Sequence, residues 1–297
     1  MQFSNQNKAY LFAISAVLLW STIASAFKIT LEYIDYIQLL LLASIFSSIA
    51  LFLILMIQGK IYLLKQLQRK DLLQSALLGF LNPFLYYLVL LKAYTLLKAQ
   101  EAGTLNYIWP ITLVLLSIPL LKQKINWISI VAIFTSFFGI MIISTEGKIA
   151  SLGFREPVGV FLAVISSVFW ALYWIYNVKD RRDEIVKLFV NFVFGTIFIL
   201  IVVLLFSDIR NIQLPGIWGS LYIGLFEMGI TYLLWLKALK FSINTAKVSN
   251  LVYISPFISL IIIRNVVGEQ ILVSTIVGLV FIISGIIIQQ FSSGKKS

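Results

Sequence analysis

Long apolar runs, separated by short polar segments, follow one another along almost the whole chain. A helix of roughly 20 apolar residues crosses the hydrocarbon core of a bilayer, and each run approaches that length. The pattern therefore predicts an all-α polytopic membrane protein with ten transmembrane helices. Their expected positions are 9–27, 36–57, 71–91, 101–121, 126–144, 157–177, 187–206, 215–236, 247–264 and 271–290.

The positions of Lys and Arg between these runs predict the orientation. If the chain threads back and forth ten times, 16 of its 23 basic residues fall on the side of the N-terminus and 7 on the other. Because basic residues accumulate in cytoplasmic loops, we expect both termini to be cytoplasmic. The net charge of +11 then reflects contact with anionic lipid, not with nucleic acid. We expect a multi-pass protein of the cell (inner) membrane whose partner is the lipid bilayer.

Composition narrows the classes of protein further. Of 297 residues, 60% are hydrophobic and 12% charged, with a mean hydropathy of +0.98, which leaves no room for a separate soluble domain. Lys8 leads directly into the first apolar run, so no signal peptide is expected. Without Cys or His there are no disulfides, thiolate metal sites or haem attachment, and proton handling must use Asp or Glu. We expect no metal, no cofactor and no enzymatic activity.

The two halves of the chain repeat each other at a fixed spacing. Matching pairs predict two five-helix repeats, residues 1–145 and 157–292. Because five is odd, the second repeat must enter the membrane inverted, which is typical of alternating-access transporters. The pairs are Gly79 with Gly224, Tyr87 with Tyr232, Lys92 with Lys237, Tyr107 with Tyr253, Pro110 with Pro256, and Gln123 with Glu269.

Several motifs resemble one known family. They are Leu19-Trp20-Ser21, the two Tyr-x-x-Pro motifs that open the fourth and ninth spans, Gly268-Glu269, Gly278 and Gly285. In this pattern the chain resembles ten-helix EamA-type members of the drug/metabolite transporter superfamily, which implies a transporter. Gln123 stands where such proteins usually carry Glu, and no Arg is present in the second span, where one is often seen. These departures weigh against binding of an anionic substrate through an arginine.

The candidate site rests on one acid in the middle of a span, Glu227, because an ionisable group is costly there. Its repeat mate is Asn82, followed by Pro83, which frees a backbone carbonyl. Aromatic residues on polar helix faces suit flat or amphipathic organic solutes. The predicted substrate-binding residues are Trp20, Asn82, Tyr86, Tyr107, Trp170, Tyr173, Glu227 and Tyr253.

Other interpretations of these residues stay open. Glu227 could be a structural link between helices, and Tyr173 could belong to an aromatic belt at the membrane interface. Glu101 and Glu269 are expected to be helix caps. Ser136, Gly139, Ser284 and Gly285 mark the fifth and tenth helices as lipid-facing or packing elements.

The function expected is secondary transport of amino acids or similar small organic metabolites, as an exporter. No Walker A motif is present, so ATP is not the direct energy source. Proton coupling through Glu227 and uncoupled movement both stay open, and we expect a monomer or weak dimer. The alternatives are a multidrug exporter of hydrophobic cations, a membrane enzyme acting on lipid, and an ion channel. The last two lack the expected residue clusters or filter motifs.

Overall fold

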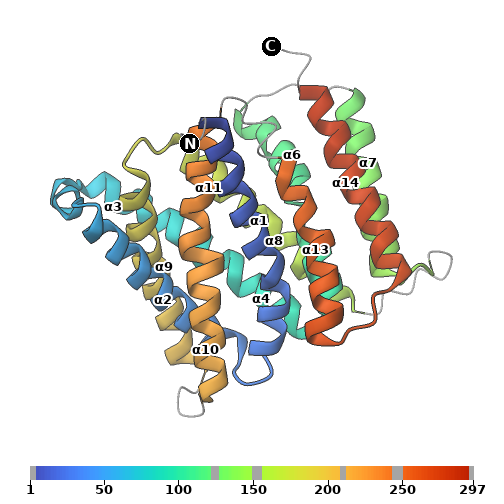
Figure 1. Cartoon of the computed structure of the whole chain (residues 1–297), viewed down its shortest axis with the longest axis horizontal. Helices are drawn as coiled ribbons and strands as arrows, with labels where there is room; N and C mark the ends of the chain where they lie inside the picture. Colours follow the sequence, from blue (N-terminus) through green and yellow to red (C-terminus); the bar gives the residue numbers. More distant parts are fainter. Residues whose placement is uncertain (1–4, 122–126, 149–155, 208–211, 243–249, 294–297) are drawn as a thin grey trace. The chain divides into compact units, whose positions relative to one another are not determined.

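The computed structural model describes residues 5–121, 127–148, 156–207, 212–242 and 250–293 (Figure 1). Within these ranges every regular element is a helix. The basic residues Lys122, Lys124, Arg155, Arg210, Lys247, Lys295 and Lys296, and the repeat position Gln123, lie outside the described residues.

Among the described residues, six stretches are long and apolar enough to cross a membrane, and each coincides with a predicted span. Two of the six contain short π-helical segments, η2 and η5. The stretches are α1 (Asn5–Thr30), α2 (Tyr36–Ile57), α3 (Arg69–Gly79) with η2 (Phe80–Leu85) and α4 (Tyr86–Leu96), α8 (Pro157–Lys179), α9 (Glu184–Phe206), and α10 (Leu214–Ile223) with η5 (Gly224–Gly229) and α11 (Ile230–Phe241).

The other predicted spans are occupied by shorter or interrupted helices. These are α5 (Ala99–Asn106), α6 (Trp109–Leu121), α7 (Trp127–Ser144), η6 (Asn250–Ile254), α13 (Ser255–Ile262), η7 (Ile263–Val267) and α14 (Val273–Ser293). A further short helix, η1 (Ile61–Gln66), connects α2 to α3. The chain is therefore an all-helical protein of the polytopic membrane type. The count of ten spans and the orientation of the termini stay predictions.

The fourth predicted span is two helices, not one. The helix that begins at Ala99 ends at Asn106, and a second begins at Trp109. Pro110 explains the interruption, because it has no N–H to donate to the carbonyl of Asn106 and cannot continue the same helix. The ninth span is likewise interrupted, since Pro256 lies in the first turn of α13 after the 3₁₀ segment η6.

Polar residues fix where the long helices begin. The Asp35 carboxylate accepts hydrogen bonds from the backbone N–H groups of Ile37 (2.7 Å) and Gln38 (3.0 Å) at the start of α2. Asp183 does the same for Ile185 (3.1 Å) at the start of α9. These caps satisfy N–H groups that no helical carbonyl can reach, which sets the helix boundaries within otherwise uniform apolar sequence.

The contacts divide the chain into two compact units, and each takes helices from both halves of the sequence. Unit 1 comprises residues 1–88 and 180–267, and unit 2 comprises residues 89–179 and 268–297. Unit 1 therefore holds α1, α2, α3, α9, α10, α11 and α13. Unit 2 holds α5, α6, α7, α8 and α14.

In unit 1, α3 and η2 lie directly against α9. A Cβ atom added to Gly79 would collide with the backbone oxygen of Asn191, and one added to Gly195 would lie 2.5 Å from Cδ of Pro83. The two glycines thus allow the backbones to approach closely where α3 ends. Beyond this crossing, the ring of Phe198 packs against those of Phe80 and Phe84 at 5.6 and 6.0 Å.

In unit 2, α7 and α14 lie side by side along their length (Figure 1). A Cβ added to Gly139 would lie 2.5 Å from the backbone oxygen of Gly278, and one added to Gly285 would lie 2.6 Å from that of Ala132. The hydroxyl of Ser136 also donates to the carbonyl of Ile282 at 3.3 Å. These small residues let the backbones of α7 and α14 approach closely.

Candidate functional site

Both repeat mates of the predicted site lie where a helix is interrupted. Asn82 is in the π-helical segment η2 and has non-helical backbone angles, with φ −152° and ψ 120°. Glu227 is in the π-helical segment η5, between α10 and α11. Such segments expose backbone groups and re-aim side chains, and they are frequent at functional sites. The first half has a proline at this point, Pro83, whereas the second half has none in η5.

A buried chain of hydrogen bonds connects the two interruptions. The Nδ2 of Asn82 donates to the Tyr232 hydroxyl at 3.2 Å, and the Tyr87 hydroxyl donates to Oε1 of Glu227 at 3.0 Å. The two hydroxyls lie 3.4 Å apart. Because Tyr87 and Tyr232 are themselves repeat mates, each half of the chain supplies a tyrosine to the polar residue of the other half.

Glu227 has few polar neighbours. Its side chain is buried, and its one hydrogen-bond donor among the described residues is Tyr87. It forms no ion pair with the Lys and Arg side chains that the structure describes. A buried acid that no cation neutralises is costly as an anion, so this position favours a group that gains or loses a proton or meets a charged ligand.

Aromatic rings surround the hydroxyl pair. The ring of Tyr86 lies 4.6 Å from that of Tyr87, which also has Phe27 at 6.5 Å. The ring of Phe192 lies 6.2 Å from that of Tyr232. The predicted residue Tyr86 therefore packs beside the chain of hydrogen bonds in unit 1.

Two further predicted residues of unit 1, Trp20 and Tyr253, flank a polar contact between α1 and α13. The hydroxyls of Ser21 and Ser255 lie 3.0 Å apart. Trp20 directly precedes Ser21 and Tyr253 lies two residues before Ser255, so both residues are near this contact in the chain. The ring of Trp20 lies 5.4 Å from that of Trp235, on α11.

The predicted residues of unit 2 gather along α8. The ring of Trp170 lies 6.5 Å from those of both Tyr173 and Trp109 and 5.6 Å from that of Trp174. Tyr173 is fully buried, so its ring does not face lipid. Tyr107 follows α5 directly, next to Asn106, whose Nδ2 donates to the Ser166 hydroxyl at 3.1 Å.

Glu101 and Glu269 are helix caps, and they protect the same helix. Oε2 of Glu101 accepts from the backbone N–H of Lys98 at 3.2 Å. Glu269, far away in sequence, accepts from the backbone N–H groups of Ala99 (2.8 Å) and Gln100 (3.2 Å). Both carboxylates thus lie at the N-terminus of α5, where the helix dipole favours negative charge.

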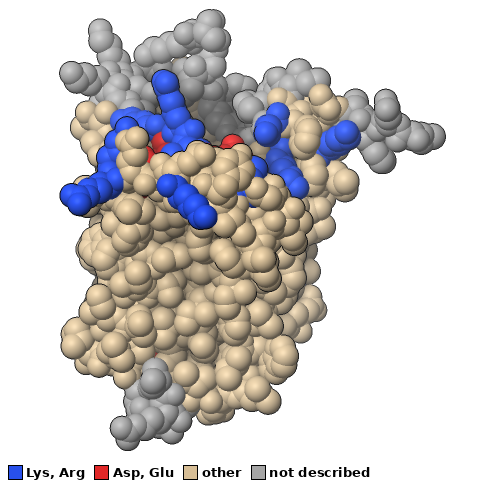
Figure 2. Space-filling view, turned by 90° about the vertical axis from the view of Figure 1, so that its left-hand side faces the viewer, with Lys and Arg blue, Asp and Glu red and all other residues tan. Residues whose placement is uncertain are grey.

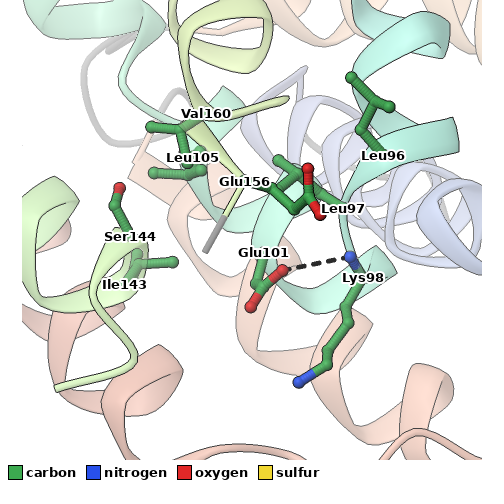
Figure 3. A pocket seen from close by; sticks show the side chains of 9 residues that line it. All are labelled: Leu96, Leu97, Lys98, Glu101, Leu105, Ile143, Ser144, Glu156 and Val160. Carbon is green, nitrogen blue, oxygen red and sulfur yellow. Dashed lines mark hydrogen bonds between the residues drawn. The ribbon is translucent and has the colours of Figure 1, made fainter. Parts of the chain in front are cut away.

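A pocket opens beside this capped helix end in unit 2 (Figure 3). Its volume is about 90 Å³, whereas pockets for drug-sized ligands measure roughly 300–1,000 Å³. It is therefore smaller than a typical site for a drug-sized ligand. Its lining consists of Leu96, Leu97, Lys98, Glu101, Leu105, Ile143, Ser144, Glu156 and Val160.

One end of unit 1 carries a cluster of charges between the α2–α3 connection and the start of α9. Lys60 pairs with Asp183 at 2.7 Å, and Arg182 pairs with Asp180 at 2.5 Å while donating to the backbone oxygen of Asp71 at 3.0 Å. Figure 2 shows Lys and Arg gathered at one end of the face it displays. We call this end of unit 1, defined by the five residues named here, the basic end.

The cations near Asp180 and Asp183 lower the pKa of both carboxyl groups. Burial opposes ionisation of Asp180, but hydrogen bonds from Arg182 and the charges of Arg182 and Lys187 outweigh it, so its pKa lies below the ordinary value. Burial likewise opposes ionisation of Asp183, and the Lys60 contact with the capping N–H bonds lowers its pKa overall.

Sequence reasoning left Tyr87, Tyr232 and Trp235 outside the predicted site. The two tyrosines were detectable, because each stands five residues after Asn82 or Glu227 and five before the repeated lysine. What the spacing could not show was that each contacts the opposite half. Trp235 has no comparable signal, since it becomes a site neighbour only through its packing on Trp20.

Buried polar groups at paired helix breaks, within an all-helical apolar chain, are typical of membrane transport proteins. The EamA-like transporter family matches residues 7–145 and again residues 157–289. The chain belongs to this family, and the resemblance to the drug/metabolite transporters is confirmed.

Relatives agree with this membership. An uncharacterized transporter of Clostridium kluyveri is 29% identical over 300 residues, covering 98% of this chain and 95% of the relative. The aromatic amino acid exporter YddG of Escherichia coli is 28% identical over 185 residues, covering 60% of this chain and 61% of the relative. A solved crystal structure has the same fold, with a TM-score of 0.68, 18% identity and coverage of 98% and 99%.

Proposed function

We propose that this transporter moves an amino acid or a similar small organic metabolite out of the cell by alternating access. It is a secondary transporter, since its sequence contains no nucleotide-binding loop. The observation that carries the proposal is the crossed pairing of Asn82 with Tyr232 and of Glu227 with Tyr87.

Crossed pairing is what two inverted repeats produce when they meet at a common axis. Both mates lie at interruptions of their helices, and broken helices near the membrane midplane form the substrate and ion sites of inverted-repeat transporters. This arrangement supports two inverted repeats, residues 1–145 and 157–292, around a polar centre. Ten spans with both termini in the cytoplasm remain part of the proposal, on the apolar runs and the distribution of Lys and Arg.

The aromatic residues near the predicted site residues support an amphipathic organic solute as the substrate. Aromatic rings pack on Trp20 and Tyr86 in unit 1 and, separately, on Trp170 in unit 2. The relative from Escherichia coli is named as an exporter of aromatic amino acids. An amino acid would bring an ammonium group that a Glu227 carboxylate can neutralise, and its side chain would pack among aromatic rings.

Glu227 has two possible roles, and one variant separates them. If Glu227 carries a coupled proton, Glu227→Gln lowers flux driven by a pH gradient by about a hundredfold, the usual contribution of a positioned proton-transfer group. Exchange of labelled for unlabelled solute at equal pH then continues. If the carboxylate instead holds the substrate ammonium, both kinds of flux fall together.

The assay uses the purified full chain in lipid vesicles, with labelled amino acids, nucleosides and cationic dyes as the panel. Glu32→Gln is the matched control, because Glu32 is exposed outside the helices. Absence of flux for the whole panel, in correctly folded and oriented protein, would contradict transport of these solutes. Unchanged flux and pH response in Glu227→Gln would rule out both roles.

A second candidate is export of hydrophobic cations. It is favoured by the cluster of Trp109, Trp170 and Trp174, since aromatic faces attract cations. Here the cationic dyes of the panel should be carried, and neutral aromatic amino acids should fail to compete with them.

A further inference from the structure

The chain of hydrogen bonds that ends at Glu227 is open at its other end. Asn82 uses its Nδ2 to bind Tyr232, but its Oδ1 is buried without a hydrogen-bond partner among the described residues. Asn82 is fully buried. A buried carbonyl oxygen of this kind accepts a hydrogen bond from a ligand or a water molecule in almost all proteins.

A second buried amide, Asn191, belongs to the helix that packs against α3 and η2. It is on α9 at the crossing with α3, where its backbone approaches Gly79, three residues before Asn82. Its side chain is fully buried, and neither its oxygen nor its nitrogen has a partner in the part of the chain that the structure describes. Two donors and two acceptor sites are therefore available at this crossing.

From this crossing toward the basic end, successive turns of α3 and the next turn of α9 carry polar residues. Ser75 is one turn before Gly79 on α3, fully buried, and its hydroxyl has no partner among the described residues. Lys187 is one turn before Asn191 on α9, and its Nζ donates to the backbone oxygen of Asp180 at 3.2 Å. One turn further along α3 is Asp71, whose carbonyl oxygen binds Arg182.

In the opposite direction the seam between α3 and α9 is apolar. The rings of Phe80, Phe84 and Phe198 pack together there, with centroids 5.3 to 6.0 Å apart. Polar groups therefore lead from the buried centre to one end of unit 1, and they stop at the aromatic cluster on the other side.

We propose that Ser75 and Asn191 hold water along the α3–α9 seam, and that this water connects Glu227 with the solution at the basic end. The proposal rests on the proposed function, because it supplies the route for a proton coupled to transport. Under the expected orientation, the basic end faces the cytoplasm.

The proton balance is simple. In this proposal, a water bound to Oδ1 of Asn82 at the inner end of the water file gives a proton to the Tyr232 oxygen and takes another from the file. The proton of the Tyr232 hydroxyl passes to Tyr87, whose own proton passes to the Glu227 carboxylate. Each hydroxyl gains and loses one proton, so both tyrosines stay neutral and Glu227 becomes a carboxylic acid. Tyr87 donates to Glu227 over 3.0 Å, whereas the hydroxyls of Tyr232 and Tyr87 lie 3.4 Å apart and must move closer for the transfer between them.

Other titratable groups around Glu227 do not provide a competing route in the described residues. The facing groups are the hydroxyls of Tyr87 and Tyr232, with Tyr86 packed on Tyr87. Of the helices packed on η5, α2 and α10 contain no charged residue. The basic residues of α1 and α11 lie in the outer turns of these helices; they are Lys8, Lys28, Lys237 and Lys240, while Tyr36 begins α2 and Tyr222 lies on α10.

The test measures proton exchange at Glu227 directly. In the full chain in lipid vesicles, the infrared carboxyl band that disappears in Glu227→Gln reports on protonated Glu227. Its shift after transfer to D₂O gives the exchange rate. Asn191→Leu should slow the exchange by about tenfold, the effect of losing one ordinary hydrogen bond, and Ser75→Ala should slow it in the same direction.

Thr196→Val is the matched control, because Thr196 is on the same helix but binds Ser44 at 2.6 Å and the carbonyl of Phe192. Wild-type exchange in Asn191→Leu and Ser75→Ala, or equal slowing in Thr196→Val, would each overturn the route. Ser75→Ala decides the matter if Asn191→Leu does not fold. Solute exchange at equal pH, measured on the same vesicles, tests the proposed function separately.

Discussion

Glu269 joins two distant segments through backbone N–H groups, and this contact gives a prediction for a single residue. Glu269→Ala should lower the free energy of unfolding by about 1–2 kcal/mol, because the N–H groups of Ala99 and Gln100 lose their acceptor. Glu269→Gln should lose less, since its amide oxygen still accepts. Thermal unfolding in detergent measures both, with exposed Glu32→Gln as the control. Equal stability of Glu269→Ala and Glu32→Gln would contradict the capping role.

Single residues also show how far the sequence could predict the site. Glu227 and Asn82 were found because a charged or amide group is conspicuous among apolar neighbours and because the lysine register pairs them. Their partners depend on how two chain segments meet in space, and the spacing within one segment does not contain that information. Asn191 was missed because it stands alone among Phe and Val residues, with no motif or repeat to mark it.

At the level of elements, the apolar pattern predicted helix positions better than helix continuity. The run 36–57 coincides with α2, where Asp35 provides a cap. The run 101–121 is interrupted between Asn106 and Trp109, because hydropathy averages over the break that Pro110 imposes. The π-helical segments η2 and η5 are equally invisible to hydropathy, although they hold the candidate site.

The pair formed by α7 and α14 gives a prediction for element packing. Gly→Ala in a helix interior ordinarily stabilises by up to about 1 kcal/mol. Gly285→Ala should instead destabilise by about 1–3 kcal/mol, because its Cβ would lie 2.6 Å from the backbone oxygen of Ala132 and must separate the helices. Gly159→Ala is the comparison, since the atoms nearest its Cβ belong to the side chains of Leu97 and Leu96, which can shift more easily than a backbone oxygen. Unfolding in detergent should rank Gly285→Ala below Gly159→Ala, and the reverse order would be inconsistent with close packing of α7 and α14.

For the whole molecule, the sequence predicts an inverted duplication, whereas the contacts define units that cut across it. Unit 1 contains segments of both halves, so the duplication cannot be recognised as two separate bodies. It is visible in the crossed hydrogen bonds of Tyr87 and Tyr232, where equivalent residues exchange partners. The sequence repeat shows which residues of the two halves are equivalent. The contacts in the structure are needed to show which of these residues bind one another.

The inverted orientation itself leads to the last prediction, which the absence of cysteine makes easy to test. Lys65 and Gln213 occupy equivalent connections in the two halves, as do Thr95 and Lys240, and all four are exposed. In single-cysteine variants of intact cells, an impermeant maleimide should label Thr95→Cys and Gln213→Cys from outside. Lys65→Cys and Lys240→Cys should react only after the membrane is opened, because inversion places equivalent positions on opposite sides. If both members of either pair are labelled from the same side, the two halves run parallel, and the site cannot be formed by inverted repeats.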